Sequence, residues 1–430
     1  MRFLKAYKTD FLIKVFSANS LGVALKSFLS LVSQKLIAIY LGPDGIALVG
    51  NLRNALALFG LGSIVGVDQG VIKYQSEYDI NTEKLKKLYA TSLAYSLVGS
   101  LLVGLILFFG ATFWSHFILN TPDYNYLFII LAFTIPFTAL YNLCFALVNG
   151  KSNYKKAILL SLSSSSIITL LIIVFTINSG LSGALLAIIL TPISQIIVLL
   201  LFAKNEVSLI LKFKPYFFKV FRSKLTIFSL MALVTVVFNN IIEIQLRNHL
   251  IEKLSKEDAG YWSSILNISN YYLLFLAGIY SVYILPKYAK IKTLSSFIIE
   301  VKQIYKVVIP VFSILLISIY FLRGTIISLL YTESFTDMQV LFKWQLIGDL
   351  VKIIAVILAY QFVAQKLWIT FIITEVISFS AWYMFSIYFI DKMGVEGIVF
   401  AHFLRYILYL VIVVFSVRVF FVNKVNHENK

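Results

Sequence analysis

Apolar runs of about 20 residues, separated by short polar connections, recur along the whole 430-residue chain. Each run is long enough to cross the roughly 30 Å hydrocarbon core of a bilayer as a helix. A soluble domain could not bury so much apolar surface, because 60% of the residues are hydrophobic and only 13% are charged. The sequence therefore predicts an all-α polytopic membrane protein.

The positions of the runs predict twelve transmembrane helices. Most connections between them are too short to fold into a separate soluble domain. The predicted spans are 14–40, 46–74, 85–113, 126–149, 155–177, 183–203, 226–250, 259–285, 303–329, 339–364, 367–390 and 396–420.

Lysine and arginine are distributed unequally between alternate ends of these spans. One set of ends carries 24 of them, whereas the other set carries 3, namely Lys253, Lys256 and Lys392. Basic residues accumulate on the cytoplasmic side of membrane proteins, so both termini are expected in the cytoplasm. The same bias, with attraction to anionic lipid headgroups, accounts for most of the +17 net charge without a nucleic-acid partner.

The chain matches itself when it is shifted by about 214 residues. "GPDGIAL" at 42–48 aligns with "KEDAGYW" at 256–262, and "NSGLSGALLA" at 178–187 with "KMGVEGIVFA" at 392–401. The second match places Gly180 on Gly394 and Gly183 on Gly397. Two six-helix lobes that are parallel repeats are therefore expected, as in many secondary transporters. Their predicted bounds are 1–203 and 225–430, joined by a basic amphipathic linker on the cytoplasmic leaflet at 204–224.

Arg53 lies about two turns inside the second span, in a segment with seven glycines that can let the helix pack closely and bend. An arginine in hydrocarbon costs at least a few kcal/mol unless it faces a partner or water. Residues three, four or seven positions apart share a helix face, and several spans carry polar stripes with this spacing. Glu243 and Arg247 can thus form an ion pair within the seventh span.

A cavity between the two halves is the economical place for these polar faces. Its deeply placed charge is positive in sum, which favours an anionic guest, although each residue could instead form a helix–helix contact. The predicted cavity-lining polar residues are Asn19, Lys35, Asn51, Asn54, Asn239, Glu243, Asn267, Asn270 and Arg405, beside Lys26, Arg53 and Arg247.

The sequence shows no pattern for catalysis, for a metal or for a cofactor. The four histidines are scattered, and neither a metal-ligand motif nor a phosphate-binding loop is present, so we expect no enzyme activity. His402 and the single cysteine, Cys144, are interpreted as packing residues of their spans. The basic N-terminus is interpreted as an uncleaved cytoplasmic start rather than a signal peptide.

Several segments closely resemble the Wzx-type flippases, which include O-antigen translocases and lipid III flippases. These segments are "YLGPDGIALVGNLRNALALFG" (40–60), "GVIKYQSEY" (70–78), "IYSVYILPKYAKI" (279–291) and "FTDMQVLFKWQLIGDLVKIIAVILAYQFVAQ" (335–365). The resemblance is collinear over nearly the whole chain, and it places the protein in the polysaccharide transporter branch of the MOP superfamily.

The resemblance implies a V-shaped fold of two lobes and an alternating-access cycle in the bacterial inner membrane. The implied cargo is an undecaprenyl-pyrophosphate-linked oligosaccharide, moved from the cytoplasmic to the periplasmic leaflet and coupled to H⁺ or Na⁺. On this basis Arg53, Arg247 and Lys26 are predicted to bind the pyrophosphate, Arg being favoured because its planar fork grips phosphate oxygens. Asp349 and Glu375 are the predicted ion-coupling carboxylates, because protonatable groups at mid-membrane are rarely without function.

Alternatives from other classes remain open. A MATE-like cation or drug antiporter shares the fold but requires an acidic cavity. A non-transporting partner of a polysaccharide assembly complex could scaffold a polymerase. A lipid II flippase is a related alternative, although such flippases usually have two further helices. If the protein is a flippase, a polysaccharide polymerase and a chain-length regulator are possible partners.

Overall fold

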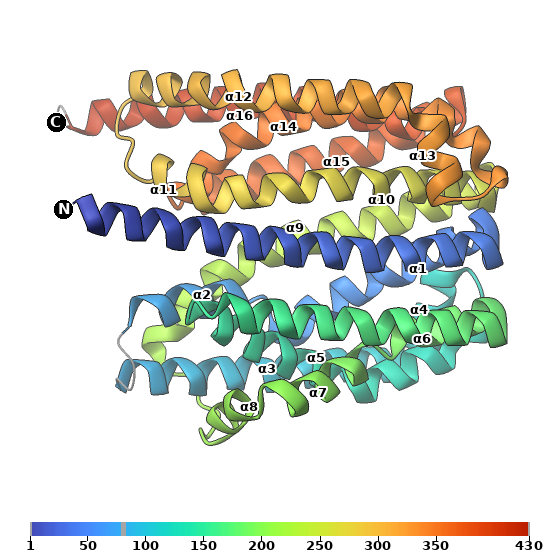
Figure 1. Cartoon of the computed structure of the whole chain (residues 1–430), viewed down its shortest axis with the longest axis horizontal. Coiled ribbons are helices and arrows are strands. Elements are labelled where there is room, and N and C mark those ends of the chain that lie inside the picture. The colour runs from blue at the N-terminus through green and yellow to red at the C-terminus, as the bar shows by residue number, and fades with distance from the viewer. Residues whose placement is uncertain (1, 79–82, 429–430) are drawn as a thin grey trace. The chain divides into compact units, whose positions relative to one another are not determined.

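The described part of the computed structural model, residues 2–78 and 83–428, consists of helices joined by short turns (Figure 1). The chain divides into two compact units. Unit 1 comprises Met1–Leu41 and Asn51–Val236, and unit 2 comprises Gly42–Gly50 and Val237–Lys430. The predicted lobe bounds 1–203, 204–224 and 225–430 stay a prediction.

Unit 1 is built around α5, which packs against α2, α3, α4, α6, α7 and α8. Its interior is apolar, and Leu143, Cys144 and Leu147 of α5 are fully or almost fully buried there. The helices are α1 (Arg2–Ile64), α2 (Asp68–Glu77), α3 (Glu83–Phe109), α4 (Ala111–Leu119), the short η1 (Pro122–Tyr124), α5 (Asn125–Gly150), α6 (Tyr154–Ile189), α7 (Thr191–Phe202) and α8 (Lys204–Leu211).

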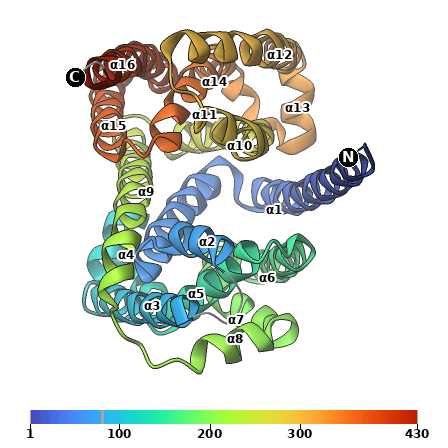
Figure 2. The ribbon, with the colours of Figure 1, turned by 90° about the vertical axis from the view of Figure 1, so that its left-hand side faces the viewer.

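The helix α9 (Lys219–Lys253) carries the chain from unit 1 into unit 2. In unit 2, α16 packs along both α14 and α15, while α12 packs on α14. Figure 2 views α12 and α16 nearly end-on. The elements are α10 (Lys256–Ile279), the π-helical η2 (Tyr280–Ile284), α11 (Leu285–Tyr288), α12 (Leu294–Phe321), α13 (Arg323–Leu330), η3 (Glu333–Leu341), α14 (Phe342–Ala364), α15 (Trp368–Met393) and α16 (Glu396–Glu428).

Two glycines break long helices at positions where the sequence separates predicted spans. Gly42, with φ of 62°, divides α1 between the spans predicted at 14–40 and 46–74. Gly180, with φ of 55°, divides α6 between those predicted at 155–177 and 183–203. Glycine is required there because ψ is −164° at Gly42 and −133° at Gly180, and a Cβ atom makes this combination of angles costly. The span predicted at 46–74 is wrong at its end: the helix stops at Ile64, Val65 has φ of 55°, and α2 starts at Asp68.

Nine helices of the described residues are long and apolar enough to cross a membrane, or ten if the pair α7 and α8, bent by 99°, counts as one. One of the nine, Gly22–Ile64, contains the break at Gly42. The all-α membrane architecture predicted from the sequence is confirmed, whereas the count of twelve spans stays a prediction.

Positions that the predicted repeat aligns share their backbone conformation. Gly180 has φ/ψ of 55°/−133°, and Gly394 has 62°/−143°. A second pair is related by the same shift of 214 residues: Ser152 has φ of 56°, and Lys366 has φ of 58°. Left-handed conformations are uncommon outside glycine, so their recurrence at this shift supports the duplication.

Candidate functional site

Arg53, on the part of α1 that follows the break, is the central basic residue of unit 1. Its guanidinium is half-buried and donates from Nη1 to Gln34 Oε1 at 3.3 Å. Gln34 is 2% exposed, and its amide nitrogen has no hydrogen-bond partner among the described residues. A group of N–H donors with an amide nitrogen still available is suited to an anion.

The other predicted residues of unit 1 have varied environments. Lys26 is exposed, and Lys35 and Asn54 are half-buried. Asn51 is fully buried and donates to the carbonyl oxygen of Ile118 in α4 at 2.8 Å, which links two helices. The side chain of Asn19 lies outside the described part of the structure.

Arg247 of α9 is 2% exposed and lies wholly within unit 2. Its Nε donates to Ser263 Oγ at 2.7 Å, and its Nη2 lies 3.8 Å from Glu243 Oε2, the pair that the spacing predicted. The guanidinium also lies over the Trp262 ring, 5.1 Å from its centroid. A Cβ atom at Gly50 would approach the Arg247 Cζ to 3.2 Å, so glycine permits this close packing.

The stripe predicted along the seventh span is a connected hydrogen-bonded group. Asn239 donates from Nδ2 to Glu243 Oε1 at 2.9 Å, so Glu243 connects Asn239 to Arg247. On α10, Asn267 is half-buried and Asn270 is exposed. The structure thus joins Asn239, Glu243 and Arg247 into one group.

A second polar cluster, centred on Asp349, lies in the interior of unit 2. Asp349 of α14 is fully buried, and its Oδ1 is 3.0 Å from His402 Nε2 of α16. Its Oδ2 accepts from the Tyr272 hydroxyl of α10 and, at 3.2 Å, from Gln345 Nε2. A Cβ atom at Gly348 would lie 2.6 Å from the His402 ring, so glycine permits the approach of α16. We call Tyr272, Gln345, Asp349 and His402 the Asp349 cluster.

Arg405 lies in an aromatic box of the same unit. Its Nε donates to Ser378 Oγ at 3.0 Å, and its guanidinium lies 4.3 Å from the centroid of Phe379 and 4.5 Å from that of Trp382. Aromatic faces attract a cation, which stabilises this 4% exposed arginine in the interior.

The second predicted carboxylate, Glu375 of α15, accepts from the Tyr409 hydroxyl of α16 at 2.7 Å. Lys352, one turn beyond Asp349, has its Nζ 5.6 Å from the centroid of the Tyr406 ring. Glu375, like Asp349, therefore has a tyrosine donor from a neighbouring helix.

Some partners of these groups were not predicted from the sequence. Tyr272, Ser378 and Gln34 were not predicted as site residues, although each bonds to a residue that was. The sequence signal for Tyr272 was weak: it follows Ser269 by three positions, which places both on one helix face. In the structure their hydroxyl oxygens lie 3.1 Å apart. Among the described residues, no group of three or more His, Cys, Asp or Glu side chains could hold a metal ion.

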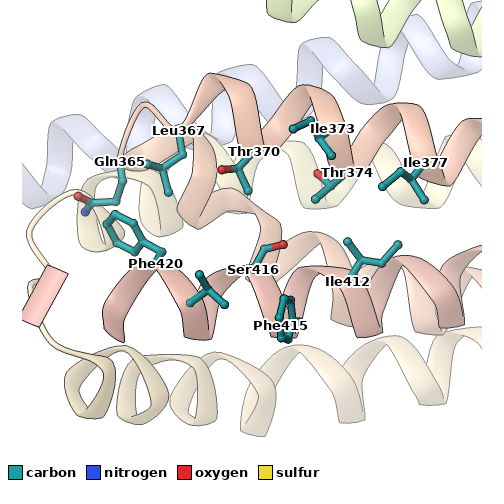
Figure 3. Close-up of a pocket in the computed structure, with 11 residues that line it drawn as sticks. Gln365, Leu367, Thr370, Ile373, Thr374, Ile377, Ile412, Phe415, Ser416 and Phe420 are labelled. Carbon is teal, nitrogen blue, oxygen red and sulfur yellow. The ribbon is translucent and has the colours of Figure 1, made fainter. Parts of the chain in front are cut away.

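The interior clusters are distinct from a groove of about 810 Å³ between α15 and α16. Figure 3 shows Thr370, Ile373 and Ile377 of α15 along one side of this groove and Ile412 and Phe415 of α16 along the other. Its lining residues are apolar or uncharged, so the groove offers no cation to a phosphate group.

Comparison with known proteins identifies relatives over most of the chain. A model of a family described as polysaccharide biosynthesis protein matches residues 12–292. The lipid III flippase of Escherichia coli (strain K12) is 30% identical over 376 residues, which cover 87% of this chain and 90% of that flippase. The lipid III flippase of Shigella flexneri matches to the same extent.

Solved structures share the fold at low sequence identity. An inward-facing multidrug resistance MATE family transporter of the MOP superfamily gives a TM-score of 0.74 at 14% identity, covering 93% of this chain and 96% of the transporter. The lipid II flippase MurJ, in an inward closed conformation, gives 0.70 at 18% identity, covering 94% and 87%. The predicted MOP fold is thereby confirmed.

Proposed function

The chain belongs to the polysaccharide biosynthesis protein family, and on this premise we propose that it is a lipid-linked oligosaccharide flippase. Its substrate is an undecaprenyl-pyrophosphate-linked oligosaccharide, such as an O-antigen repeat or one like that of enterobacterial common antigen. The protein moves this substrate from the cytoplasmic to the periplasmic leaflet of the bacterial inner membrane by alternating access, with both of its termini in the cytoplasm.

The relationship to the lipid III flippase of Escherichia coli carries this proposal. The alignment covers 87% of this chain and 90% of that flippase, so it is not limited to one shared motif. Transport requires no covalent chemistry from the protein, and we therefore assign it a transport role rather than an enzymatic one.

The pyrophosphate is the group of this substrate that the basic residues recognise. In unit 1, Arg53 and the exposed Lys26 supply positive charge, and the unpaired amide nitrogen of Gln34 adds a donor. In unit 2, Arg247 is a further ligand once it exchanges its carboxylate partner Glu243 for phosphate. Charge-assisted hydrogen bonds to phosphate are about twice as strong as neutral ones, which favours arginine here.

The transport cycle draws on an ion gradient of H⁺ or Na⁺, for which Asp349 and Glu375 are the coupling carboxylates. Both lie in unit 2. A polysaccharide polymerase and a chain-length regulator are the partners that would act on the delivered oligosaccharide.

Proteoliposomes containing the purified full-length protein test the proposal. A fluorescent undecaprenyl-pyrophosphate-linked oligosaccharide is placed in one leaflet, and its appearance in the other is followed with a membrane-impermeant quencher. We expect Arg53→Ala to lower the flipping rate about tenfold or more, since a charge-assisted bond contributes about 1.5–3 kcal/mol. Arg53→Lys should retain part of the flipping rate, because lysine keeps the positive charge but lacks the planar guanidinium that can bind two phosphate oxygens at once.

The matched control is Arg323→Ala. Arg323 is also a half-buried arginine, but it donates to the carbonyl oxygen of Tyr320 at 2.8 Å at the start of α13. Its removal should leave flipping unchanged. Normal flipping by Arg53→Ala would contradict the phosphate site. If the wild-type protein moves organic cations but not the lipid-linked oligosaccharide, it is an antiporter of the MATE kind.

A further inference from the structure

The Asp349 cluster places a carboxylic acid and a histidine side by side within the interior of unit 2. Asp349 is 0% exposed and His402 is 5% exposed. Burying an ionisable group away from water is costly unless its charge is compensated by close partners. Three helices supply those partners here: α10 supplies Tyr272, α14 supplies Gln345, and α16 supplies His402.

The donors around Asp349 favour a proton over a metal cation. A hard cation such as Na⁺ or Ca²⁺ needs several oxygen ligands, which come from carboxylates, carbonyl groups and water. The Asp349 oxygens instead face a ring nitrogen, a phenol O–H group and an amide N–H group. An imidazole can take up a proton without any change of ligand shell, and its ordinary titration lies within the physiological range.

The charged and titratable groups around the pair and its neighbouring cations come from five helices. The positive charges of Lys352 and Arg405 disfavour protonation of His402. The negative charge of Glu375 partly compensates both cations, and that of Glu243 partly compensates Lys352. The set comprises Glu243 on α9, Tyr272 on α10, Lys352 on α14, Glu375 on α15, and Arg405, Tyr406 and Tyr409 on α16.

We propose that the Asp349–His402 pair is the proton-binding site of the transport cycle, a proposal that rests on the proposed flippase function. In the proton-free state, neutral His402 donates from Nε2 to Asp349 Oδ1. One proton then binds at Nδ1 and forms an imidazolium, which the adjacent carboxylate stabilises, and loss of that proton restores the starting state. Because His402 lies on α16 and Asp349 on α14, proton binding strengthens the link between these two helices.

Trp382 provides a direct readout of this proton. Its ring centroid lies 6.4 Å from that of His402, and a charged imidazolium at this range quenches indole fluorescence. We expect the emission of the purified full-length protein to decrease as the pH is lowered and His402 takes up its proton. His402→Gln should abolish this transition, Asp349→Asn should displace it by at least about one pH unit, and Trp382→Phe should remove most of its amplitude.

His116→Gln is the control for the loss of a histidine. His116 is an exposed residue of α4 in unit 1, so this variant should titrate as the wild type does. Replacing sodium by choline at equal ionic strength should also leave the transition unchanged. A transition that persists in His402→Gln, or an emission change that follows sodium rather than pH, would overturn the proton site.

Flipping in proteoliposomes separates this proposal from the function on which it rests. An imposed pH difference should accelerate wild-type flipping, and His402→Gln should reduce that acceleration at least about fivefold, the lower range of typical coupling between sites. If His402→Gln retains the full response, the proton site is wrong and the flippase function stands. If the fluorescence transition is present but no gradient produces flipping, the proposed function fails while the site stands.

Discussion

Arg53 and Arg247, the two arginines proposed to bind pyrophosphate, differ in burial. Arg53 is half-buried and donates to the neutral amide of Gln34, whereas Arg247 is almost fully buried and lies 3.8 Å from a carboxylate. Separating an arginine from a buried carboxylate leaves both charges uncompensated, which costs more than displacing an amide. We therefore expect Arg247 to bind pyrophosphate only where a phosphate oxygen replaces the Glu243 carboxylate as its anionic partner.

The same contrast predicts that Glu243→Gln destabilises the protein. The change leaves Arg247, whose side chain is 3% exposed, without its compensating carboxylate. We expect the free energy of unfolding to fall by about 2–3 kcal/mol. Breaking a fully buried ion pair costs about 3–5 kcal/mol, and the effect should be smaller here because the Glu243 side chain is 18% exposed. Thermal unfolding in detergent should show a midpoint lower by several degrees.

The control for Glu243→Gln is Glu83→Gln. Glu83 lies 3.9 Å from Lys86 and 4.0 Å from Lys87, but its side chain is 68% exposed. Exposed pairs contribute about 0–1 kcal/mol, so this variant should unfold close to the wild-type temperature. Equal effects of the two variants would mean that the Arg247 pair adds nothing beyond an exposed ion pair.

Tyr409→Phe should destabilise unit 2 by removing the donor to Glu375. The two atoms lie 2.7 Å apart, and Tyr409 is 3% exposed. Glu375 is half-buried, so the loss of this donor should cost about 1 kcal/mol and the unfolding midpoint should fall. Tyr388→Phe on the same unit, at a 53% exposed tyrosine, serves as the control and should leave the midpoint unchanged. An unchanged midpoint for Tyr409→Phe would show that Glu375 gains its stabilisation elsewhere.

At the scale of elements, a glycine with positive φ ends a helical segment at corresponding positions in the two halves of the chain. Gly180 and Gly394 adopt nearly the same left-handed conformation, and a Cβ atom at Gly183 or Gly397 would lie 2.0 Å or 2.1 Å from a carbonyl oxygen of the preceding helix. A substitution at these positions meets backbone rather than a movable side chain. These glycines thus fix where one helical segment ends and the next begins.

Gly394→Ala should therefore lower the stability of unit 2. A residue with a Cβ atom at φ of 62° and ψ of −143° is strained by about 1–3 kcal/mol. Gly324→Ala is the matched control, since its φ is ordinary and no atom lies within 4 Å of the added methyl group. We expect a lower unfolding midpoint in detergent for Gly394→Ala alone. Comparable midpoints for both variants would mean that the chain relaxes around position 394.

Local sequence patterns predicted contacts within a helix but could not predict those between helices. The four-residue spacing of Glu243 with Arg247 corresponds to a contact in the structure. The bond between Tyr272 and Asp349 joins α10 to α14. Periodicity orients the face of one helix and does not determine which helix packs against that face. The missed break at Val65 has a similar origin, because a β-branched residue gives no signal for a left-handed turn.

At the scale of the whole molecule, charge distribution predicts how the chain crosses the membrane. The 24 basic residues at one set of ends and the 3 at the other predict a single orientation. The structure describes the helices and their connections, and the membrane sides remain a prediction from charge. The predicted orientation can be tested directly with two connections of the same unit that are predicted on opposite sides of the membrane.

Single cysteines at Lys256 and Lys292, both exposed in unit 2, can test this orientation. The natural Cys144 is fully buried and should give no background. We expect a membrane-impermeant maleimide to label Lys256→Cys in intact spheroplasts, because that connection is predicted on the periplasmic side. Lys292→Cys should react only after lysis. The reverse pattern would place both termini outside the cytoplasm, and the proposed direction of transport would then have to be reconsidered.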